Sequence, residues 1–340
     1  MIVESIHKLV EKTDLTKHEA YECITEIMSG KASDAVIASF LTALRMKGET
    51  SQEIAGSAQA MREMATTINT RHKNVIDTCG TGGDGLGTFN ISTASAIVAS
   101  AAGAVVAKHG NRAVSSKCGS ADVLKALGVK IDLEKEHVEQ CLDQIQIAFL
   151  FAPLLHGAMK YAMPVRKELG MRTIFNMLGP LTNPAGAKRQ VLGVFRRSLT
   201  ETVANVLLDL GTERALVVHG EGGMDELSTI GETRISEIVH GEVKTYTFSY
   251  ASVGIPTADL RALSGGDSET NKLVIESVLS GTKGAPRDIV VLNAGAAIYT
   301  AGLADSINEG VVMAGTVIDN GKAKRKLKEL VDFTNSFLNG

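Results

Sequence analysis

The sequence predicts an α/β fold in which a large domain holds a mostly parallel central sheet flanked by helices, and a small all-helical domain precedes it. The first seventy or so residues contain helical patterns and no strand-like run. From Asn74 onward, short apolar runs alternate with helical patterns, which is typical of a parallel sheet covered by helices. We therefore expect a helical domain over residues 1–70 and an α/β domain over residues 74–340.

The helices of the first domain are marked by their ends. Thr16 with Glu19 and Thr50 with Glu53 form Thr-x-x-Glu capping boxes, in which each side chain binds the other residue's backbone amide. Glycines at positions 30 and 48 suit helix ends. The apolar stripes of these helices are too extensive for one small bundle, so we expect the domain to dock against a second copy of the chain.

The strands expected in the large domain are short apolar runs. The first begins with Val75 and Ile76, and the others are Ala104–Ala107, Ala148–Phe151, Val191–Phe195, Leu216–His219 and Ile289–Leu292. Helices such as Glu201–Leu210 and Asn271–Leu279 lie between them. Because each run is too short to show a clear period, length and context decide these assignments.

Two segments depart from this alternation. Residues 234–250 are expected to form local antiparallel strands with a turn at His240, Gly241 and Glu242. Residues from about 165 to 187 are helical at first and then rich in Gly, Pro and Asn. We expect this second segment to cross back to the helical domain and return.

Composition excludes several classes of protein. The 340 residues carry a formal net charge of −3, with 4% aromatic residues and no Trp, so a surface for nucleic acid is not expected. The four cysteines are widely spaced and suggest neither a zinc site nor a disulfide framework. The N-terminal residues lack the order of a signal peptide, and no apolar stretch is long enough for a membrane span. We expect a cytoplasmic protein that does not associate with membranes.

The strongest local signal is a glycine-rich loop between the first strand and the next helix. Five glycines fall between positions 80 and 87, and a helix is expected to begin near Asn90 or Ile91. Glycines let the backbone approach a ligand closely, and the amides and helix N-terminus then attract an anion. The match of residues 80–85 to G-x-G-x-x-G is weak alone, and a flexible surface turn is the alternative.

A second, basic loop follows the next strand. Lys108, Arg112 and Lys117 supply charge, serines supply hydroxyls, and Ser120 is expected to cap the helix that ends at Leu127. In a parallel sheet both loops lie at the carboxyl ends of adjacent strands, where ligands usually bind. A single basic loop is usually just solvated, but two such loops in succession favour a site for a polyanion.

Two further features suggest chemistry. Asp225 and Glu226 lie in a glycine-rich loop and suit Mg²⁺, which takes few protein carboxylates beside substrate phosphates and water; an acidic surface turn is the alternative. His156 and Arg166 are expected on the helix after Pro153. Arg166 could pair with a carboxylate through two hydrogen bonds, and an ordinary surface arginine is the alternative.

Taken together, these motifs resemble those of the anthranilate phosphoribosyltransferases. The matching segments cover the chain in consistent order and are residues 77–85 (DTCGTGGDG), 88–93 (TFNIST), 108–112 (KHGNR), 175–184 (FNMLGPLTNP) and 225–226. The resemblance implies a nucleoside phosphorylase/phosphoribosyltransferase-like fold, a homodimer that associates through the helical domains, and Mg²⁺ as cofactor. It also implies transfer of the phosphoribosyl group of phosphoribosyl pyrophosphate to anthranilate, a step of tryptophan biosynthesis.

The resemblance further implies roles for individual residues. The donor site would comprise Gly80, Gly83, Asp84, Thr88, Asn90, Ile91, Ser92, Thr93, Lys108, Asn111, Arg112, Ser116 and Ser120. The anthranilate site would comprise Gly80, His109, Asn111, His156, Arg166 and Pro180. The Mg²⁺ site would comprise Ser92, Asp225 and Glu226.

The sequence offers no clear covalent nucleophile, and the chemistry needs none. Positioning and electrostatic stabilisation of the departing pyrophosphate would dominate. A pyrimidine nucleoside phosphorylase, which uses inorganic phosphate and a nucleoside, is the main alternative. A nucleic-acid-binding relative of the same fold is a second alternative, disfavoured by the net charge of −3.

Overall fold

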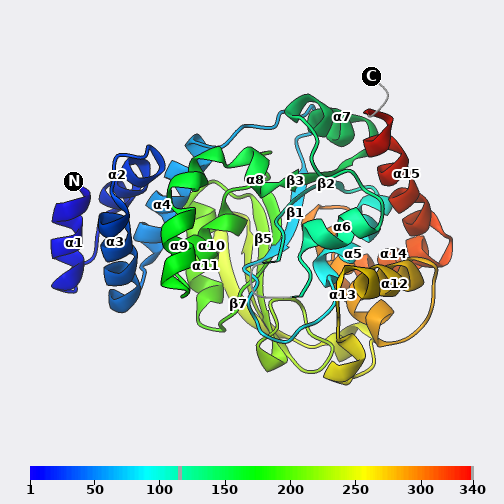
Figure 1. Ribbon diagram of the computed structural model, residues 1–340. Helices are drawn as coiled ribbons and strands as arrows, with labels where there is room; N and C mark the ends of the chain where they lie inside the picture. The colour runs from blue at the N-terminus through cyan, green and yellow to red at the C-terminus, as the bar shows by residue number, and fades with distance from the viewer. Residues whose placement is uncertain (114–116, 338–340) are drawn as a thin grey trace.

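The computed structural model describes residues 1–113 and 117–337, and in this part the strands form one seven-stranded sheet (Figure 1). The strands are β1 (Val75–Gly80), β2 (Val105–Gly110), β3 (Ile147–Phe151), β4 (Arg189–Gly193), β5 (Arg214–Gly220), β6 (Thr233–Val239) and β7 (Glu242–Phe248). Their order is β3-β2-β1-β4-β5-β6-β7, with β1 to β5 parallel and β6 and β7 antiparallel. The mostly parallel sheet is therefore confirmed, as is the β6–β7 hairpin.

The helices alternate with these strands in the large part of the molecule and stand alone at its N-terminus. They are α1 (Ile2–Val10), α2 (Lys17–Met28), α3 (Asp34–Lys47), α4 (Ser51–Glu63), α5 (Ile91–Ala101), α6 (Ser120–Ala126), α7 (Lys135–Ile145), α8 (Ala152–Leu155), α9 (Met163–Leu169), α10 (Phe175–Leu178), α11 (Leu199–Asp209), α12 (Ser268–Leu279), α13 (Ala285–Thr300), α14 (Ile307–Asp319) and α15 (Lys322–Ser336). Within the described ranges, no helix is both long and apolar enough to cross a membrane.

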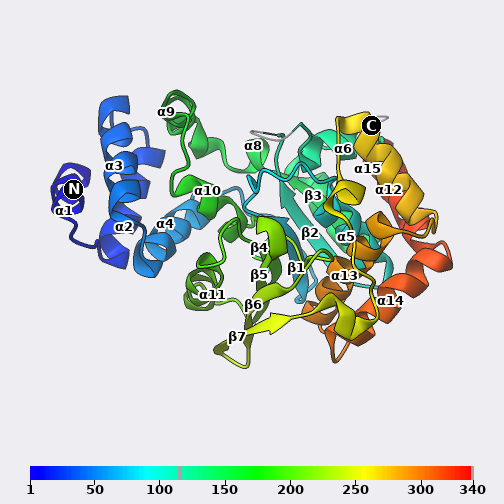
Figure 2. The same ribbon diagram turned by 90° about the horizontal axis from the view of Figure 1, so that it is seen from below.

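Helices cover both faces of the sheet, and β5 shows how the two faces are separated. Leu216 and Val218 belong to a buried apolar cluster shared with α5, α13 and α14. Ala215 and Val217, which alternate with them, belong to a second cluster shared with α11 and the N-terminal helices. Figures 1 and 2 show α11 and α13 on opposite sides of the strands. Burial on both faces explains why the parallel strands are apolar runs without alternation.

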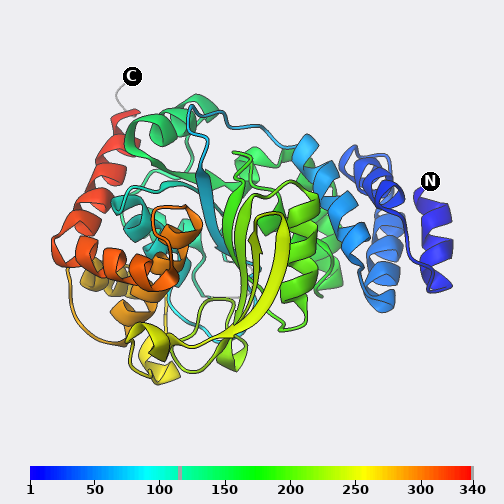
Figure 3. The ribbon, with the colours of Figure 1, turned by 180° about the vertical axis from the view of Figure 1, so that it is seen from behind.

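The four N-terminal helices form one end of the molecule, opposite α12 to α15 (Figure 3). Both expected capping boxes are present: Thr16 accepts from the Glu19 amide at 3.2 Å, and Thr50 accepts from the Glu53 amide at 3.3 Å. The Arg62 guanidinium at the end of α4 donates to the carbonyls of Leu181 at 2.7 Å and Leu210 at 3.1 Å. The N-terminal helices are thus joined to the sheet-bearing part by buried apolar contacts and by hydrogen bonds.

The segment from about 165 to 187 lies between these two parts (Figure 2). Val165, Ile174 and Phe175 are buried in the same apolar cluster as Phe40 and Leu44 of α3. Further along, Pro184 has returned to the sheet-bearing part, where its carbonyl accepts from the Ile68 amide at 3.0 Å. The segment therefore packs against the N-terminal helices and then returns.

One expected strand is wrong. Ile289–Leu292 lies in the first half of α13, which begins with Pro286 in its first turn and continues through small residues such as Gly295. This helix is buried on almost every side, so it lacks the polar face that would reveal a helical period. A four-residue apolar window therefore could not separate the helix from a buried strand.

Two local assignments also need correction. His156 and Arg166 do not share one helix, because α8 ends at Leu155, a 3₁₀ turn covers Gly157–Tyr161, and α9 starts at Met163. Ser120 is the first residue of α6 rather than its cap. Gly119 occupies the cap position instead. A glycine is needed there because any Cβ would overlap the backbone of the preceding loop.

Candidate active site

The chain changes direction in the sheet at β1 and β4. From β1 it moves outward through β2 and β3, then returns to β4 on the other side and continues to β5. Gly80 and Gly193 are paired at the carboxyl ends of β1 and β4, and a Cβ on either residue would overlap Asp225. Asp225 therefore occupies the topological switch point of the sheet, the place where ligands of open α/β sheets bind.

The glycine-rich loop leaves β1 at this point and is held by hydrogen bonds to its surroundings. The Thr81 amide donates to the Gly193 carbonyl at 2.9 Å, and the Gly82 amide donates to Asp225 Oδ2 at 2.8 Å. Gly83 has φ of +74°, a conformation that residues with a Cβ rarely adopt. The loop leads into α5, whose first residue is Ile91 with Asn90 as the N-cap, as the sequence predicts.

Two acidic residues meet the glycine loop and the start of α5. Glu226 Oε1 accepts from the Ser92 amide at 3.1 Å, so the carboxylate sits against the N-terminus of that helix. Burial raises the pKa of Asp225 well above its usual range, and the neighbouring Asp84 carboxylate raises it further. Burial likewise raises the pKa of Glu226, with a second contribution from Asp225. The carboxyl groups of Asp84, Asp225 and Glu226 repel one another, and a cation bound nearby would relieve that repulsion.

These residues fit Mg²⁺ better than a metal held by protein alone. Within the described residues, no three His, Cys, Asp or Glu side chains are arranged to hold a metal ion. Mg²⁺ usually binds through one or two carboxylates and completes its shell with water and substrate phosphates. Asp225 and Glu226 are two adjacent, partly exposed acidic residues, which matches that pattern.

Lys108 supplies positive charge beside the carboxylates. Its side chain is only 3% exposed, and its ammonium donates to the Thr78 carbonyl at 2.5 Å and to Ser92 Oγ at 3.3 Å. The charge of Lys108 also lowers the pKa of Glu226, against the larger effect of burial. In the same first turn of α5, the buried Thr93 Oγ1 has no hydrogen-bond partner in the described part of the chain. An incoming acceptor or donor group could satisfy this hydroxyl.

The second loop lies next to the first, because β1 and β2 are adjacent. Asn111 is exposed, and its backbone carbonyl accepts from Ser120 Oγ at 3.3 Å. Arg112 lies 3.6 Å from Asp122 and stacks over Phe151, so its charge is partly neutralised. Ser116, which the sequence also places at the donor site, lies outside the described residues.

Two predicted donor-site residues also connect the loop to the rest of the structure. Asn90 donates to the Cys118 carbonyl at 3.3 Å and accepts from the Asn271 amide group at 2.9 Å. Thr88 pairs with Ser264 in an isolated bridge. Asn271 was not predicted as a site residue, and its helical spacing from the apolar Ile275 and Val278 is a signal that could have indicated it.

Two histidines expected near anthranilate meet at the carboxyl end of β2. The rings of His109 and His156 are 5.0 Å apart, and both are buried. Burial lowers the pKa of His109 to about 3, with repulsion from His156 adding to it, and burial lowers the pKa of His156 to about 4. Neither ring nitrogen of His156 has a partner within the described ranges. The pair is therefore neutral at pH 7 and leaves polar atoms for a ligand.

Two more of the predicted anthranilate residues, Pro180 and Arg166, lie on the segment between the two parts. Pro180 is buried, and its carbonyl accepts from the Gln190 side chain at 2.6 Å. The Arg166 guanidinium lies 5.4 Å from the centre of the Phe175 ring, and it forms no ion pair among the described residues. Burial lowers the pKa of Arg166 without removing its charge. That charge remains available to a carboxylate.

Sequence reasoning missed a buried acid behind the site. Asp77 is fully buried in β1, where its carboxylate accepts from the His109 amide at 3.1 Å and from the Asn183 side chain at 2.8 Å. These bonds tie the strand that carries His109 to the segment that carries Pro180. An aspartate within an apolar strand is the signal that could have indicated it. Arg172, also missed, donates to the Gly83 carbonyl.

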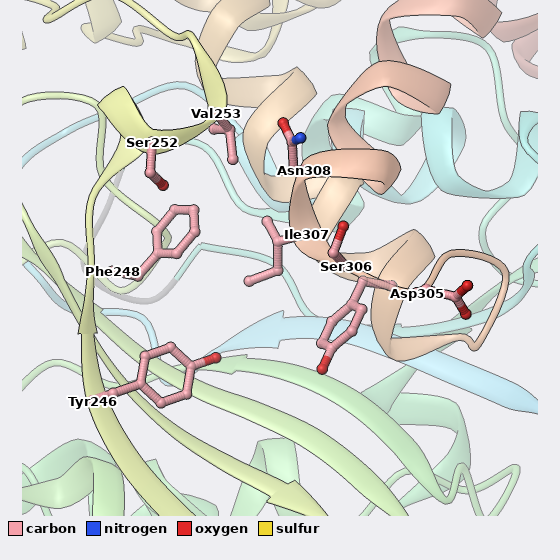
Figure 4. A pocket seen from close by; sticks show the side chains of 9 residues that line it. Tyr246, Phe248, Ser252, Val253, Asp305, Ser306, Ile307 and Asn308 are labelled. Atoms are coloured by element: carbon pink, nitrogen blue, oxygen red, sulfur yellow. The ribbon is translucent and has the colours of Figure 1, made fainter.

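A separate hollow in the described structure lies away from these residues. It measures about 320 Å³ and is lined by Tyr246, Phe248, Ile307 and neighbouring residues (Figure 4). Its two phenols, Tyr246 and Tyr299, both donate to the Glu237 carboxylate, at 2.9 and 2.6 Å. Because none of the predicted site residues that the structure describes lines this hollow, it is not the candidate site.

The fold and the site define a class of protein, the glycosyl transferase family. Its a/b domain model matches residues 72–324, and its helical bundle domain model matches residues 3–65. The anthranilate phosphoribosyltransferase of Acetivibrio thermocellus is 55% identical over 99% of this chain and 98% of its own length. That of Desulfosudis oleivorans is 52% identical over 99% of both chains.

Solved structures agree with these relatives. The anthranilate phosphoribosyltransferase of Thermus thermophilus has a TM-score of 0.92 and 44% identity over 97% of this chain and 99% of its own. The Saccharomyces cerevisiae enzyme, solved in complex with PRPP and Mg, has a TM-score of 0.91 and 28% identity over 98% of both chains. The chain therefore belongs to the anthranilate phosphoribosyltransferase family.

Proposed function

We propose that this chain transfers the 5-phosphoribosyl group of phosphoribosyl pyrophosphate to the amine of anthranilate. The products are N-(5-phosphoribosyl)anthranilate and pyrophosphate, and the reaction belongs to tryptophan biosynthesis. The observation that carries the proposal is the switch point itself. There the glycine loop and the carboxyl pair of Asp225 and Glu226 meet at the carboxyl ends of β1 and β4, and the buried Lys108 ammonium of the adjacent β2 contacts Ser92.

The donor is proposed to bind across the two loops. The glycine loop with Gly80, Gly83 and Asp84 lets the backbone approach an anion closely, and the N-terminus of α5 favours negative charge. Lys108 adds a buried positive charge, and the hydroxyls of Ser92, Thr93 and Ser120 add hydrogen bonds. The remaining donor residues of the proposal are Thr88, Asn90, Ile91, Asn111, Arg112 and Ser116. The Saccharomyces cerevisiae structure in complex with PRPP and Mg supports this class of ligand.

Mg²⁺ is proposed as the cofactor, held by Asp225, Glu226 and Ser92. The repulsion among the buried carboxyl groups is the structural support, because a divalent cation would relieve it. When bound, Mg²⁺ would neutralise negative charge on the departing pyrophosphate. Lys108 and the loop amides act on the same negative charge from the protein side.

Anthranilate is proposed to bind between the histidine pair, Pro180 and Arg166, with Gly80 and Asn111 at the donor side. The neutral rings of His109 and His156 suit an uncharged aromatic amine. Arg166 suits the carboxylate, because its planar group can form two parallel hydrogen bonds. A solved Saccharomyces cerevisiae relative is in complex with 4-fluoroanthranilate, which supports an aromatic acceptor of this kind.

The chemistry then depends on charge and position. Breaking the bond between the sugar and pyrophosphate builds positive charge on the ring and negative charge on the leaving group, and the amine attacks the opposite face. The amine of anthranilate carries almost no proton at neutral pH, so no strong general base is needed before attack. No protein nucleophile is required, and holding both substrates in line supplies much of the rate.

The wider organisation is also part of the proposal. We divide the chain into a helical domain over residues 1–70, with residues 165–187 packed against it, and an α/β domain over residues 74–340. The helical domains associate in a homodimer, supported by apolar side chains exposed on α1 and α3: Val3 is 53%, Val10 64% and Met46 83% exposed. A cytoplasmic location is supported by the cysteines, which form no disulfide within the described ranges.

A paired assay tests the proposed reaction against the nucleoside phosphorylase alternative. One arm contains phosphoribosyl pyrophosphate, anthranilate and Mg²⁺, and pyrophosphate release is measured. The other contains thymidine and inorganic phosphate, and free thymine is measured. We expect release in the first arm only. Turnover confined to the second arm would assign the phosphorylase reaction instead.

A further inference from the structure

Arg172 connects the segment between the two parts of the molecule to the glycine-rich loop. It lies between α9 and α10, and its guanidinium donates to the backbone carbonyl of Gly83. The two residues are 89 positions apart, so the bond links distant parts of the chain. Arg166 and Pro180, both proposed to bind anthranilate, lie on the same segment to either side of Arg172.

The guanidinium of Arg172 is fixed by packing as well as by this bond. It lies 4.4 Å from the centre of the Phe195 ring, within the range of a cation–π interaction. The Phe195 amide in turn donates to Thr81 Oγ1 at 3.1 Å, at the start of the glycine loop. Phe195 therefore supports both the arginine and the loop that the arginine contacts.

The close contact of Arg172 with Gly83 restricts the conformation of the glycine loop. A Cβ on Gly83 would lie 3.2 Å from the Arg172 guanidinium, and Gly83 has φ of +74°. The backbone conformation favours glycine at this position, and the guanidinium leaves little room for a Cβ. No carboxylate in the described residues forms an ion pair with Arg172, so the bond to the Gly83 carbonyl has no competitor there.

We propose that Arg172 is a positioning residue that holds the glycine loop in its donor-binding conformation and links it to the acceptor side of the site. It acts through the Gly83 carbonyl, so that the backbone of the loop is already in place before the donor arrives. The inference rests on the proposed function, because it assigns phosphoribosyl pyrophosphate as the ligand of the loop. Preorganisation of this kind raises affinity by reducing the ordering that binding requires.

The direct test is hydrogen–deuterium exchange of the free protein, which needs no ligand and no activity. The amides of Thr81, Gly82 and Leu86 have acceptors in the structure, so peptides covering residues 80–88 report whether the loop is held. Arg172→Ala should accelerate their exchange. Arg196→Ala is the matched control, because Arg196 lies over the same Phe195 ring at 5.8 Å and, among the described residues, its side chain has no hydrogen bond to the loop.

Donor affinity provides the second readout, by calorimetric titration of phosphoribosyl pyrophosphate with Mg²⁺. Because the Arg172 contact is solvent-exposed, Arg172→Ala should weaken donor binding by roughly three- to tenfold, with anthranilate binding unchanged. Arg196→Ala should leave both unchanged, and Arg172→Lys should not restore the loop's protection because an ammonium cannot reproduce the planar contact.

Each result decides the inference. It is overturned if Arg172→Ala leaves exchange of the loop unchanged, or if Arg196→Ala accelerates it equally. It is also overturned if Arg172→Lys restores donor affinity in full while the loop stays unprotected, because the role is then that of a charge for the diphosphate. A wild-type protein that binds no donor would refute the proposed function, while the exchange experiment would still test the contact.

Discussion

At the scale of single residues, the carboxyl pair at the switch point carries the most specific chemistry. Replacing both acids without changing their size, by Asp225→Asn with Glu226→Gln, should remove the dependence of activity on Mg²⁺. We expect kcat/KM to fall by about 100-fold or more, because charge stabilisation of the leaving group is lost. Folding should survive, since the change removes repulsion between buried groups. Activity that stays unchanged through a Mg²⁺ titration would refute the assignment.

The proposed role of Arg166 predicts an effect on anthranilate binding alone. Arg166→Ala should raise the KM for anthranilate and leave the KM for the donor nearly unchanged. Loss of a charge-assisted bidentate contact costs roughly 1.5–3 kcal/mol, which corresponds to about ten- to a hundredfold in kcat/KM. Steady-state kinetics with each substrate varied in turn measures this. An equal rise in both constants would move Arg166 to the donor site.

The buried histidines predict how stability depends on pH. The pKa of His156 is lowered to about 4 in the fold, below the unfolded value near 6.5. Between these values the unfolded chain binds more protons, so stability is complete above about pH 6.5 and is lost as pH falls towards 4. The contribution of His156 to the free energy of unfolding changes by about 1.4 kcal/mol per pH unit in this range.

Urea unfolding of wild type and His156→Gln across pH 7.5 to 4.5 isolates this contribution as a difference. The free energy of unfolding of wild type should fall relative to that of the variant in this window. A constant difference would mean that His156 is not held neutral by burial.

The sequence alone identified residues that belong to a short local motif, such as the glycines of the loop, Lys108 and the acidic pair. It missed Asp77 and Arg172, whose partners lie 106 and 89 positions away. Contacts over such separations depend on strand order and on the path of the segment between the two parts, which no local pattern determines. The glycine at position 83 was predicted for ligand approach, and the structure adds contact with Arg172 as a second reason.

At the scale of elements, α13 is the helix in which the sequence wrongly predicted a strand. It also packs against α5 and so holds that helix in place. Its small residues allow close packing against α14 and α5, the helix that presents Ser92 and Thr93. A Cβ on Gly310 of α14 would overlap the Gly295 carbonyl of α13. The apolar run 289–292 was correctly predicted to be buried. Its helical conformation depends on contacts with neighbouring helices, which the sequence does not reveal.

This contact gives a prediction for packing. Gly310→Ala gains about 1 kcal/mol of helix propensity, but overpacking costs typically 1–3 kcal/mol, and here the overlap is with backbone. We expect a lower melting temperature with a normal donor KM in the folded fraction. Gly315→Ala in the same helix is the control, because its Cβ would meet only Arg287 at 3.7 Å. It should be neutral or slightly stabilising, and equal behaviour of the two variants would contradict the packing argument.

At the scale of the whole molecule, the exposed apolar residues of the helical end are proposed to form the dimer interface, and those of the opposite end are not. Val10→Lys with Met46→Lys places charges on α1 and α3 and should convert the proposed dimer to a monomer in sedimentation equilibrium. Leu273→Lys on α12, at the other end, is the control, because Leu273 is 65% exposed and Val10 is 64% exposed. Retention of the dimer by the double variant would place the interface elsewhere.

The central claim is that the switch-point site joins anthranilate to a donor sugar and releases pyrophosphate. A single-turnover experiment with enzyme in excess tests it most directly, by following anthranilate fluorescence and pyrophosphate together after mixing with phosphoribosyl pyrophosphate and Mg²⁺. We predict loss of fluorescence matched one-to-one by pyrophosphate release, abolished by chelation of Mg²⁺ or by Asp225→Asn with Glu226→Gln. Pyrophosphate release without loss of anthranilate, or no reaction in the wild-type protein, would contradict the claim.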